Sequence, residues 1–216
     1  MTKKDQTYEL LLQRINSGEY PAQSYIDEKA IAKELDTSRT PVREAILSLA
    51  QEGYLKILPQ RGIIVLPFTY EDACDIFQTR KLLEPWLIQT YGPTFTEEEL
   101  EAERAQVEKD SEIHRNAEGV PGISMMHHPH VLLINRCRNH FISNILQNVE
   151  RQCIRIPNDR NKRVPYINSK SPEEVRGTHM ILLELMLQKR FDEAAKEMVH
   201  HVELAETEYM RYWFQS

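Results

Sequence analysis

Residues 8–66 carry the pattern that most restricts the fold: three short stretches with helical spacing precede two β-branched runs that flank a turn. Apolar residues recur at helical spacing up to Ile15, again around Ile31, and again from Val42 to Leu49. A few polar residues separate the second stretch from the third, as in a helix-turn-helix. Because the second helix of that motif enters the major groove of DNA, this segment is predicted to bind DNA.

The side chains at the start of the third stretch suit contact with DNA. Arg39 and Arg43 lie one helical turn apart and can donate to guanine edges or to phosphates. Ser38 and Thr40 are short hydroxyl donors to the DNA backbone. A single arginine here would more often be solvated surface, so the prediction depends on the whole order of helix, turn, helix and hairpin.

A hairpin is predicted after this helix, because the apolar runs 54–58 and 63–66 flank the turn sequence Pro59-Gln60-Arg61-Gly62. It would form the wing of a winged helix-turn-helix. Arg61 at its tip is placed to reach a phosphate or the minor groove, and Gly62 permits close approach of the backbone to DNA.

The composition fits a soluble globular protein of two domains: 216 residues, 41% hydrophobic and 28% charged, with a net charge of −6. No apolar run approaches the roughly 20 residues needed to cross a bilayer, and the N-terminus lacks the apolar segment of a secretion signal. We therefore expect a cytoplasmic protein without a membrane segment. Its three cysteines lack CxxC spacing, so we interpret them as reduced packing residues.

The charge divides along the chain. Residues 1–66 hold 9 Lys and Arg against 9 Asp and Glu, so the rest of the chain carries the whole −6. All eight histidines also lie beyond residue 66. We predict a DNA-binding domain over residues 1–67 and a second domain over residues 68–216, where titratable and metal-binding chemistry is confined.

The second domain is predicted to be an all-helical bundle, which makes the fold class mainly α. One helix begins after Thr69, an acidic one follows Thr96, and an apolar one runs from Val131 through Phe141 to residue 149. Residues 117–124 and 157–172 have loop composition. Two final helices would meet at a tight turn over residues 188–191.

That turn allows a geometric prediction about histidines. His179 and His201 lie equally far from its centre, roughly 16 Å along each helix, so they would face each other at one level. His130, which precedes an apolar stripe, is the natural third member of a three-nitrogen zinc site with an open position. Taken singly, each histidine would more often be an ordinary core or surface residue, and the adjacent His127, His128 and His200 are alternatives.

Residues 8–66 resemble the DNA-binding domain of GntR-family bacterial transcription regulators. The resemblance is carried by the motifs at 38–45, 52–55 and 59–62. It implies a homodimer whose two wings straddle a palindromic operator. Asp36 and Thr37 stand where the family usually has Gly and Val, which affects the tightness of the turn. The candidate DNA-binding residues are Lys29, Ser38, Arg39, Thr40, Arg43, Gln60, Arg61 and Gly62.

Residues 70–205 resemble the FCD (FadR C-terminal) type of effector domain. This resemblance implies a divalent metal, Zn, Ni or Mn, held by His130, His179 and His201, and a small carboxylate effector. Met126 stands where metal-binding members have an Asp ligand, and some members bind their ligand without metal. The candidate effector-binding residues are Arg80, Glu84 and Asn139.

The leading hypothesis is a DNA-binding transcriptional regulator, not an enzyme, whose operator binding responds to a small organic acid. The family implies repression. One alternative is a three-histidine metalloenzyme with an accessory N-terminal domain, but the sequence has no general base placed as in an HExxH motif. Another alternative is a DNA-binding protein that responds to no effector.

Overall fold

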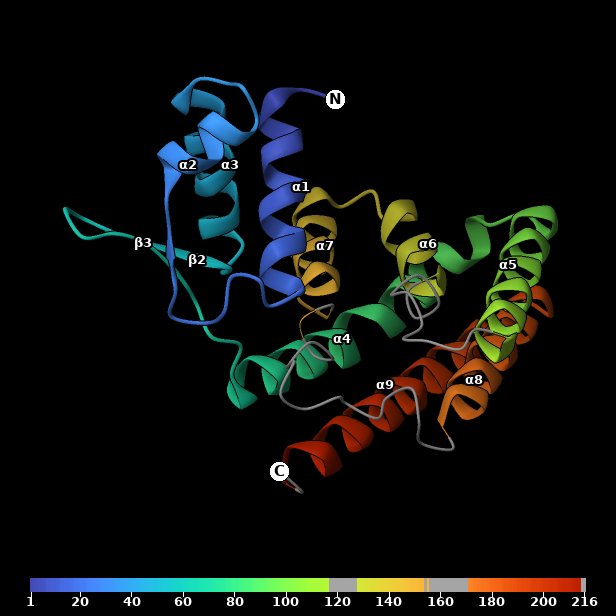
Figure 1. Ribbon diagram of the computed structural model, residues 1–216. Coiled ribbons are helices and arrows are strands. Elements are labelled where there is room, and N and C mark those ends of the chain that lie inside the picture. Colours follow the sequence, from blue (N-terminus) through green and yellow to red (C-terminus); the bar gives the residue numbers. More distant parts are fainter. Residues whose placement is uncertain (117–127, 154, 156–170, 215–216) are drawn as a thin grey trace. The chain divides into compact units, whose positions relative to one another are not determined.

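The computed structural model describes residues 1–116, 128–153, 155 and 171–214. The chain divides into two compact units, the first ending at Thr69 and the second beginning at Tyr70 (Figure 1). Helices dominate both units, which confirms the mainly α fold class. No helix within the described ranges is long and apolar enough to cross a membrane.

The first unit is a winged helix-turn-helix, as predicted. Strand β3 lies between β1 and β2 in an antiparallel sheet, and the helices enclose a core that includes Leu11, Ile46 and Tyr54. The elements are α1 (Lys3–Asn16), β1 (Tyr25–Ile26), α2 (Glu28–Glu34), α3 (Arg39–Gln51), β2 (Leu55–Leu58) and β3 (Gly62–Val65).

Strand β1 was missed by the sequence analysis. It has only two residues, too few to show an alternating pattern, and it forms because Tyr25 and Ile26 pair with Ile64 and Ile63 of the hairpin. The predicted helix cap just after it is confirmed: the Asp27 carboxylate accepts from the first backbone amides of α2. The pairing of β1 with β3 anchors the wing to the start of the helix-turn-helix.

The turn between α2 and α3 is tight although it lacks the family glycine. Asp36 adopts φ of +46°, in the left-handed region, and the Thr37 amide donates to the Ala32 carbonyl at 3.0 Å. This geometry resembles a Schellman motif formed without glycine. With Asp36 in place of the family glycine the turn is still closed, but Asp36 adopts a backbone conformation that is sterically unfavourable for a residue with a Cβ.

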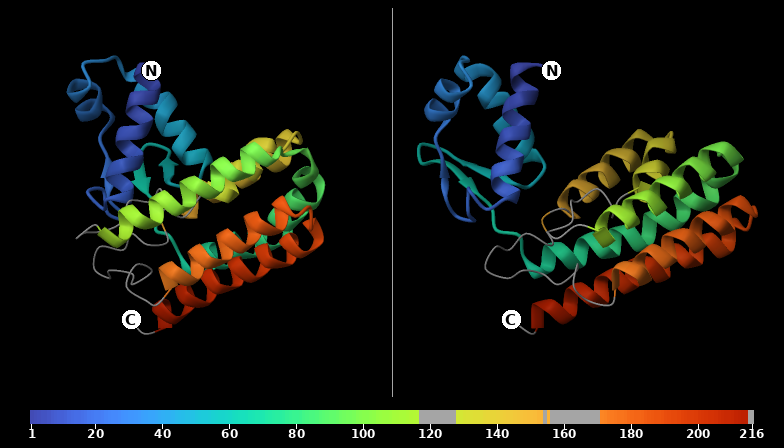
Figure 2. Two further views of the ribbon diagram at one scale, coloured as in Figure 1. Left: turned by 90° about the vertical axis from the view of Figure 1, so that its right-hand side faces the viewer. Right: turned by 45° about the vertical axis from the view of Figure 1, so that its right-hand side comes forward.

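The second unit is a helical bundle (Figure 2). Helix α4 packs against α9, α6 and α7, and α8 packs against α9 and α5. The described elements are α4 (Tyr70–Tyr91), the 3-10 helix η1 (Gly92–Thr94), α5 (Glu97–Asn116), α6 (His128–Arg136), α7 (His140–Cys153), α8 (Ser171–Leu187) and α9 (Phe191–Phe214).

The prediction of one apolar helix from Val131 to residue 149 was wrong. The chain breaks after α6, and the Asn139 side chain caps α7 by accepting from the amides of Phe141 and Ile142 at 3.1 and 3.4 Å. Phe141 is exposed instead of lying on a buried stripe. An asparagine side chain that accepts from backbone amides two and three residues ahead caps a new helix. Because Asn139 makes these bonds, α7 starts as a separate helix and α6 does not continue into it.

The tight turn between the last two helices is confirmed, with α8 ending at Leu187 and α9 beginning at Phe191. Lys189 adopts φ of +60° there, so this turn also uses a residue other than glycine in the left-handed region. The predicted loop over 117–124 and nearly all of that over 157–172 lie outside the described residues, although Pro172 falls in the first turn of α8.

Candidate functional site

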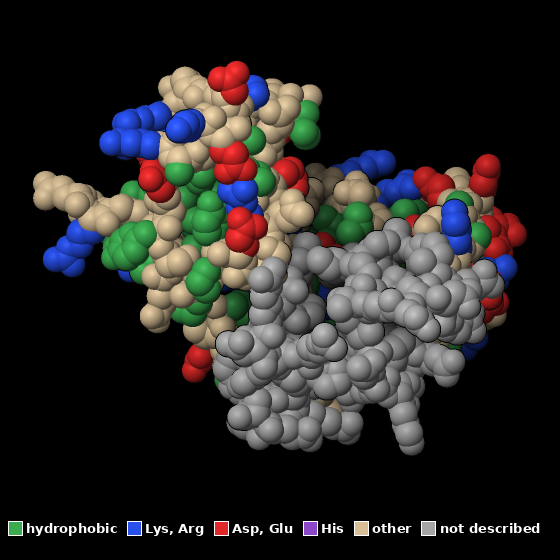
Figure 3. Space-filling model, viewed as in Figure 1, with side chains coloured by type: hydrophobic (Ala, Val, Ile, Leu, Met, Phe, Trp, Pro, Cys, Tyr) green, Lys and Arg blue, Asp and Glu red, His purple; other side chains and the backbone are tan. Residues whose placement is uncertain are grey.

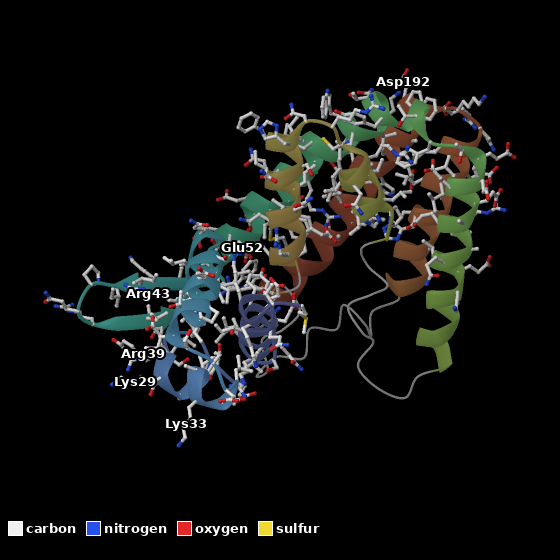
Figure 4. The ribbon with its side chains drawn as sticks, turned by 90° about the horizontal axis from the view of Figure 1, so that it is seen from above. Lys29, Lys33, Arg39, Arg43, Glu52 and Asp192 are labelled. Atoms are coloured by element: carbon white, nitrogen blue, oxygen red, sulfur yellow. The ribbon has the colours of Figure 1, made fainter. Side chains whose placement is uncertain are left out.

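The predicted DNA-contacting residues of α2 and α3 are exposed together. Lys29, Ser38, Arg39, Thr40 and Arg43 all lie on the surface of the first unit. Lys29, Arg39 and Arg43 extend from the same side of it (Figure 4). No carboxylate of the described part of the chain forms an ion pair with either arginine. Their guanidinium groups are therefore available to an external anion.

Lys33 is a cation on this side that the sequence analysis missed. It is exposed, lies one turn after Lys29 on α2, and extends from the same edge of the unit (Figure 4). The four-residue spacing of Lys29 and Lys33 repeats that of Arg39 and Arg43, and could have identified it. Lys and Arg side chains gather over α2 and α3 in the space-filling view (Figure 3).

The tip of the wing presents Gln60, Arg61 and Gly62 to solvent. The Arg61 amide donates to the Leu58 carbonyl at 3.0 Å and closes the turn, and Gly62 adopts φ of +106°. A Cβ at Gly62 would lie 3.4 Å from the ring of Tyr25. Gly62 thus serves the backbone conformation and the packing of an exposed aromatic ring, in addition to the open approach predicted from sequence.

The second unit brings His130, His179 and His201 together in its core, as predicted for His179 and His201 from their spacing and for His130 from the apolar stripe that follows it. All three are buried, and they come from α6, α8 and α9. Their Nε2 atoms lie 3.0 Å apart between His130 and His201, 3.1 Å between His179 and His201, and 3.3 Å between His179 and His130. Three imidazole nitrogens therefore converge on one point.

The hydrogen-bond partners of the Nδ1 atoms of His130 and His201 favour Nε2 atoms without a hydrogen, whose lone pairs point to the centre of the cluster. Glu84 Oε2 accepts from Nδ1 of His130 at 2.8 Å, and Arg80 Nη2 lies 3.2 Å from the same Nδ1 and 3.0 Å from Nε2. Thr178 Oγ1 lies 2.8 Å from Nδ1 of His201 and can accept from it. Rings whose Nδ1 atoms carry the hydrogen turn Nε2 lone pairs toward one another, and such lone pairs repel unless a proton or cation lies between them. The donor set fits a divalent metal with a carboxylate behind one ligand.

Arg80 and Glu84 are part of this cluster. Arg80 Nε donates to Glu84 Oε1 at 2.8 Å, one turn apart on α4, and both side chains are buried. Burial alone would raise the pKa of Glu84, but the Arg80 guanidinium and His130 lower it to about 2. The carboxylate is thus ionised and balances part of the positive charge inside the bundle.

Burial and the cationic surroundings also shift the neighbouring groups. Burial lowers the pKa of His201 well below its usual range, and His179, His130 and Arg80 act in the same direction. Burial raises the pKa of the Cys153 thiol to about 12, although Arg80 Nη1 lies 4.0 Å from its sulfur. Cys153 is therefore a protonated packing residue, as interpreted from sequence.

Other candidates do not join the cluster. Asn139 is exposed and caps α7, and His200 is exposed beside the buried His201. Met126 and His127 lie outside the described residues, as does the side chain of His128. The sequence analysis missed Thr178, and only its position directly before His179 could have drawn attention to it.

Comparisons with known proteins agree with this two-part organisation. Residues 3–65 match the model of "Bacterial regulatory proteins, gntR family", and residues 75–204 match that of the FCD domain. The HTH-type transcriptional regulator YdhC of Bacillus subtilis (strain 168) is 30% identical over 145 residues, which are 67% of this chain and 65% of YdhC. The gluconate operon transcriptional repressor of the same organism is 37% identical over 82 residues, 38% of this chain and 33% of that protein.

Solved structures share the fold. Escherichia coli McbR/YncC superposes with a TM-score of 0.75 at 16% identity, covering 99% of each chain. A GntR transcriptional regulator from Rhodococcus sp. RHA1 gives a TM-score of 0.72 at 16% identity, covering 97% of this chain and 98% of that one. The matching families and relatives are transcriptional regulators, which argues against the metalloenzyme alternative. The chain spans less than two thirds of the length of these curated relatives. It belongs to the GntR family of bacterial regulatory proteins and carries an FCD domain at residues 75–204.

Proposed function

We propose that this protein is a repressor that binds a palindromic operator as a homodimer and responds to a small carboxylate effector in its FCD domain. The observation that carries the proposal is the buried convergence of three histidine nitrogens beside Arg80, in a chain whose helix-turn-helix exposes unpaired arginines. Because its operator is chromosomal DNA, the proposed compartment is the cytoplasm.

The proposed DNA contacts are made by Lys29, Ser38, Arg39, Thr40, Arg43 and the wing residues Gln60, Arg61 and Gly62. The test is fluorescence anisotropy with the protein's own promoter region. Arg39→Ala with Arg43→Ala should weaken binding at least about tenfold, since each base-reading pair is worth about 1–3 kcal/mol. Lys189→Ala, which removes an exposed cation of the second unit, is the control. Unchanged affinity of the double variant would refute the contacts.

His130, His179 and His201 would hold the proposed divalent metal, which supplies an open coordination position to a carboxylate when bound. Protein purified without a His tag should contain near-stoichiometric Zn, Ni or Mn. His179→Ala should lose this metal, whereas His200→Ala, at an exposed neighbour of the cluster, should retain it. A metal-free protein that also ignores added ions would overturn the metal site and leave the DNA-binding proposal standing.

Arg80 is the proposed anchor for the effector carboxylate, because it is the buried cation at the cluster. Glu84 holds its guanidinium in place, and Asn139 is left out because its side chain caps α7. An effector shifts operator binding only through different affinities for two states of the protein. A thermal-shift screen of organic acids, with and without metal, should find a stabilising acid that also changes operator affinity. If neither metal nor acid raises the melting temperature, the effector-free alternative holds.

A further inference from the structure

The tip of the wing extends beyond the third strand of its sheet. The register pairs Leu58 of β2 with Gly62 of β3, and beyond this pair the chain turns through the tip that carries Arg61. Strand β1 pairs with β3 only at Ile63 and Ile64, so it ends before Gly62. The hairpin of β2 and β3 thus projects from the first unit (Figure 1). A hairpin of two strands without further support is only marginally stable in water.

Gly62 weakens the base of this tip. It has no side chain to pack against a neighbouring strand, and its φ of +106° departs from strand geometry. Gln60, with φ of +61°, is a second residue of the tip in the left-handed region. The orientation of Arg61 between them therefore depends on the contacts that hold Gly62 in place.

The ring of Tyr25 lies over Gly62. Tyr25 pairs directly with Ile64, and Gly62 is its diagonal neighbour on the same face of the sheet. A Cβ at Gly62 would lie 3.4 Å from Cδ1 and 3.8 Å from Cε1 of this ring. Apart from the chain neighbours of Gly62, no other atom of the described residues comes within 4 Å of that point. An aromatic ring that covers a glycine on the next strand supplies the packing that the glycine lacks.

The Tyr25 side chain lies outside the core of the unit. It is 61% exposed, whereas Ile26 next to it is buried in the core cluster. Its hydroxyl forms no hydrogen bond with the residues that the structure describes. The ring, and not the hydroxyl or the burial of apolar area, is therefore what this side chain contributes to the first unit.

Tyr25 also connects the wing to the helix-turn-helix. Two residues after it, Asp27 caps α2, which carries the proposed DNA contact Lys29 in its first turn. Just before it, the carbonyl of Ser24 accepts from the amide of Val65 at 2.9 Å, which fixes this stretch of chain along β3. The ring thus relates the base of the wing tip to the start of α2 through a short, hydrogen-bonded segment.

We propose that Tyr25 is a positioning residue for DNA binding: its ring covers Gly62 and orients the wing tip so that Arg61 reaches DNA together with the residues of α2 and α3. Contacts that must form together bind more tightly when their arrangement exists before binding, because less conformational freedom is lost. Without the ring, the tip samples orientations in which Arg61 misses its contact. This inference rests on the proposed DNA contacts of the wing and names the residue that orients them.

The experiment is a double-mutant cycle on operator binding, measured by fluorescence anisotropy with the protein's own promoter region. Arg61→Ala should weaken binding about tenfold and Tyr25→Ala at least about fivefold, as expected when a charge-assisted hydrogen bond is lost or misdirected. In the Arg61→Ala background, Tyr25→Ala should weaken binding by less than about twofold, because the contact that the ring orients is already gone. Tyr25→Phe keeps the ring and should bind like the wild type.

The cycle separates loss of orientation from loss of folded protein, which would lower the affinity by the same factor in both backgrounds. Ile181→Ala, at an exposed apolar residue of α8, is the control and should bind like the wild type. Losses that multiply in the double variant mean that Tyr25 contacts DNA itself or only stabilises the unit, and they overturn the proposal.

Two further outcomes distinguish this inference from the proposed function. A Tyr25→Ala protein with wild-type affinity, beside a weakened Arg61→Ala protein, overturns the positioning role and leaves the proposed DNA contacts intact. An Arg61→Ala protein with wild-type affinity refutes the wing contact itself, and the positioning role of Tyr25 with it.

Discussion

Arg80 and Glu84 form an ion pair inside the bundle, with Nε and Oε1 2.8 Å apart and both side chains buried. Removing one partner leaves an uncompensated buried charge, which costs about 3–5 kcal/mol. We expect Glu84→Gln to lower the free energy of unfolding by about this amount, and Arg80→Met with Glu84→Gln to lower it by less than the two single changes combined. Urea denaturation followed by circular dichroism measures all three.

The exposed pair of Arg104 and Glu101 on α5, 2.7 Å apart, provides the control for that comparison. Glu101→Gln should change the free energy of unfolding by less than about 1 kcal/mol, because solvent screens the pair. If Glu84→Gln were as mild as Glu101→Gln, the buried pair would contribute nothing beyond a surface contact.

The pKa of His201, which burial and then His179 and His130 lower, predicts loss of stability in acid. The unfolded chain protonates this residue near its ordinary pKa of 6.5, whereas the folded protein keeps it neutral. Below pH 6.5 the unfolded state therefore binds more protons, and the free energy of unfolding of chelator-treated protein should fall by up to about 1.4 kcal/mol per pH unit. His201→Gln should flatten this dependence below about pH 6.5 and leave the stability above it independent of this residue's protonation.

The matched variant for the acid experiment is His200→Gln, at an exposed position next to His201. It should keep the wild-type dependence of the urea midpoint on pH. A His201→Gln protein whose pH profile runs parallel to that of the wild type would show that His201 does not cause the acid loss.

Two glycines of the second unit should respond in opposite directions to substitution by alanine. A Cβ at Gly92 would lie 2.6 Å from Cδ1 of Phe191, so Gly92→Ala must displace that ring and should cost about 1–3 kcal/mol. At Gly177, inside α8, a Cβ would meet nothing within 4 Å. Gly177→Ala should therefore add about 0.5–1 kcal/mol of stability. Thermal unfolding compares the two, and a stabilising Gly92→Ala would contradict the packing of α9 against η1.

Replacing Asp36 by glycine should stabilise the first unit. Asp36 has φ of +46° in the turn before α3. Glycine adopts this conformation without steric cost. Relief of this strain should outweigh the greater freedom of glycine in the unfolded chain, for a net gain of a few tenths to about 1 kcal/mol. Asp36→Ala keeps a Cβ and should show no gain. Operator affinity should stay unchanged, because the turn is already closed in the wild type.

Much of the first unit was determined by local sequence. The Asp27 side chain caps the helix that directly follows it, and the turn sequence ending at Gly62 joins the two strands that directly flank it. The position of His179 opposite His201 was equally predictable, because a short turn between two antiparallel helices fixes which of their residues lie opposite each other. In each case the interacting groups are close in sequence, or one turn relates them.

The tertiary structure decided what distant segments do to one another. It set Arg80 and Glu84 of α4 against His130, placed Thr178 behind His201, and formed β1 by pairing with the wing. It also left Leu82 and Phe141 exposed, although their spacing on the helix suits a core. The periodicity of a sequence shows which side of a helix is apolar. Only the packing of helices far apart in the chain shows whether another part of the same molecule covers that side.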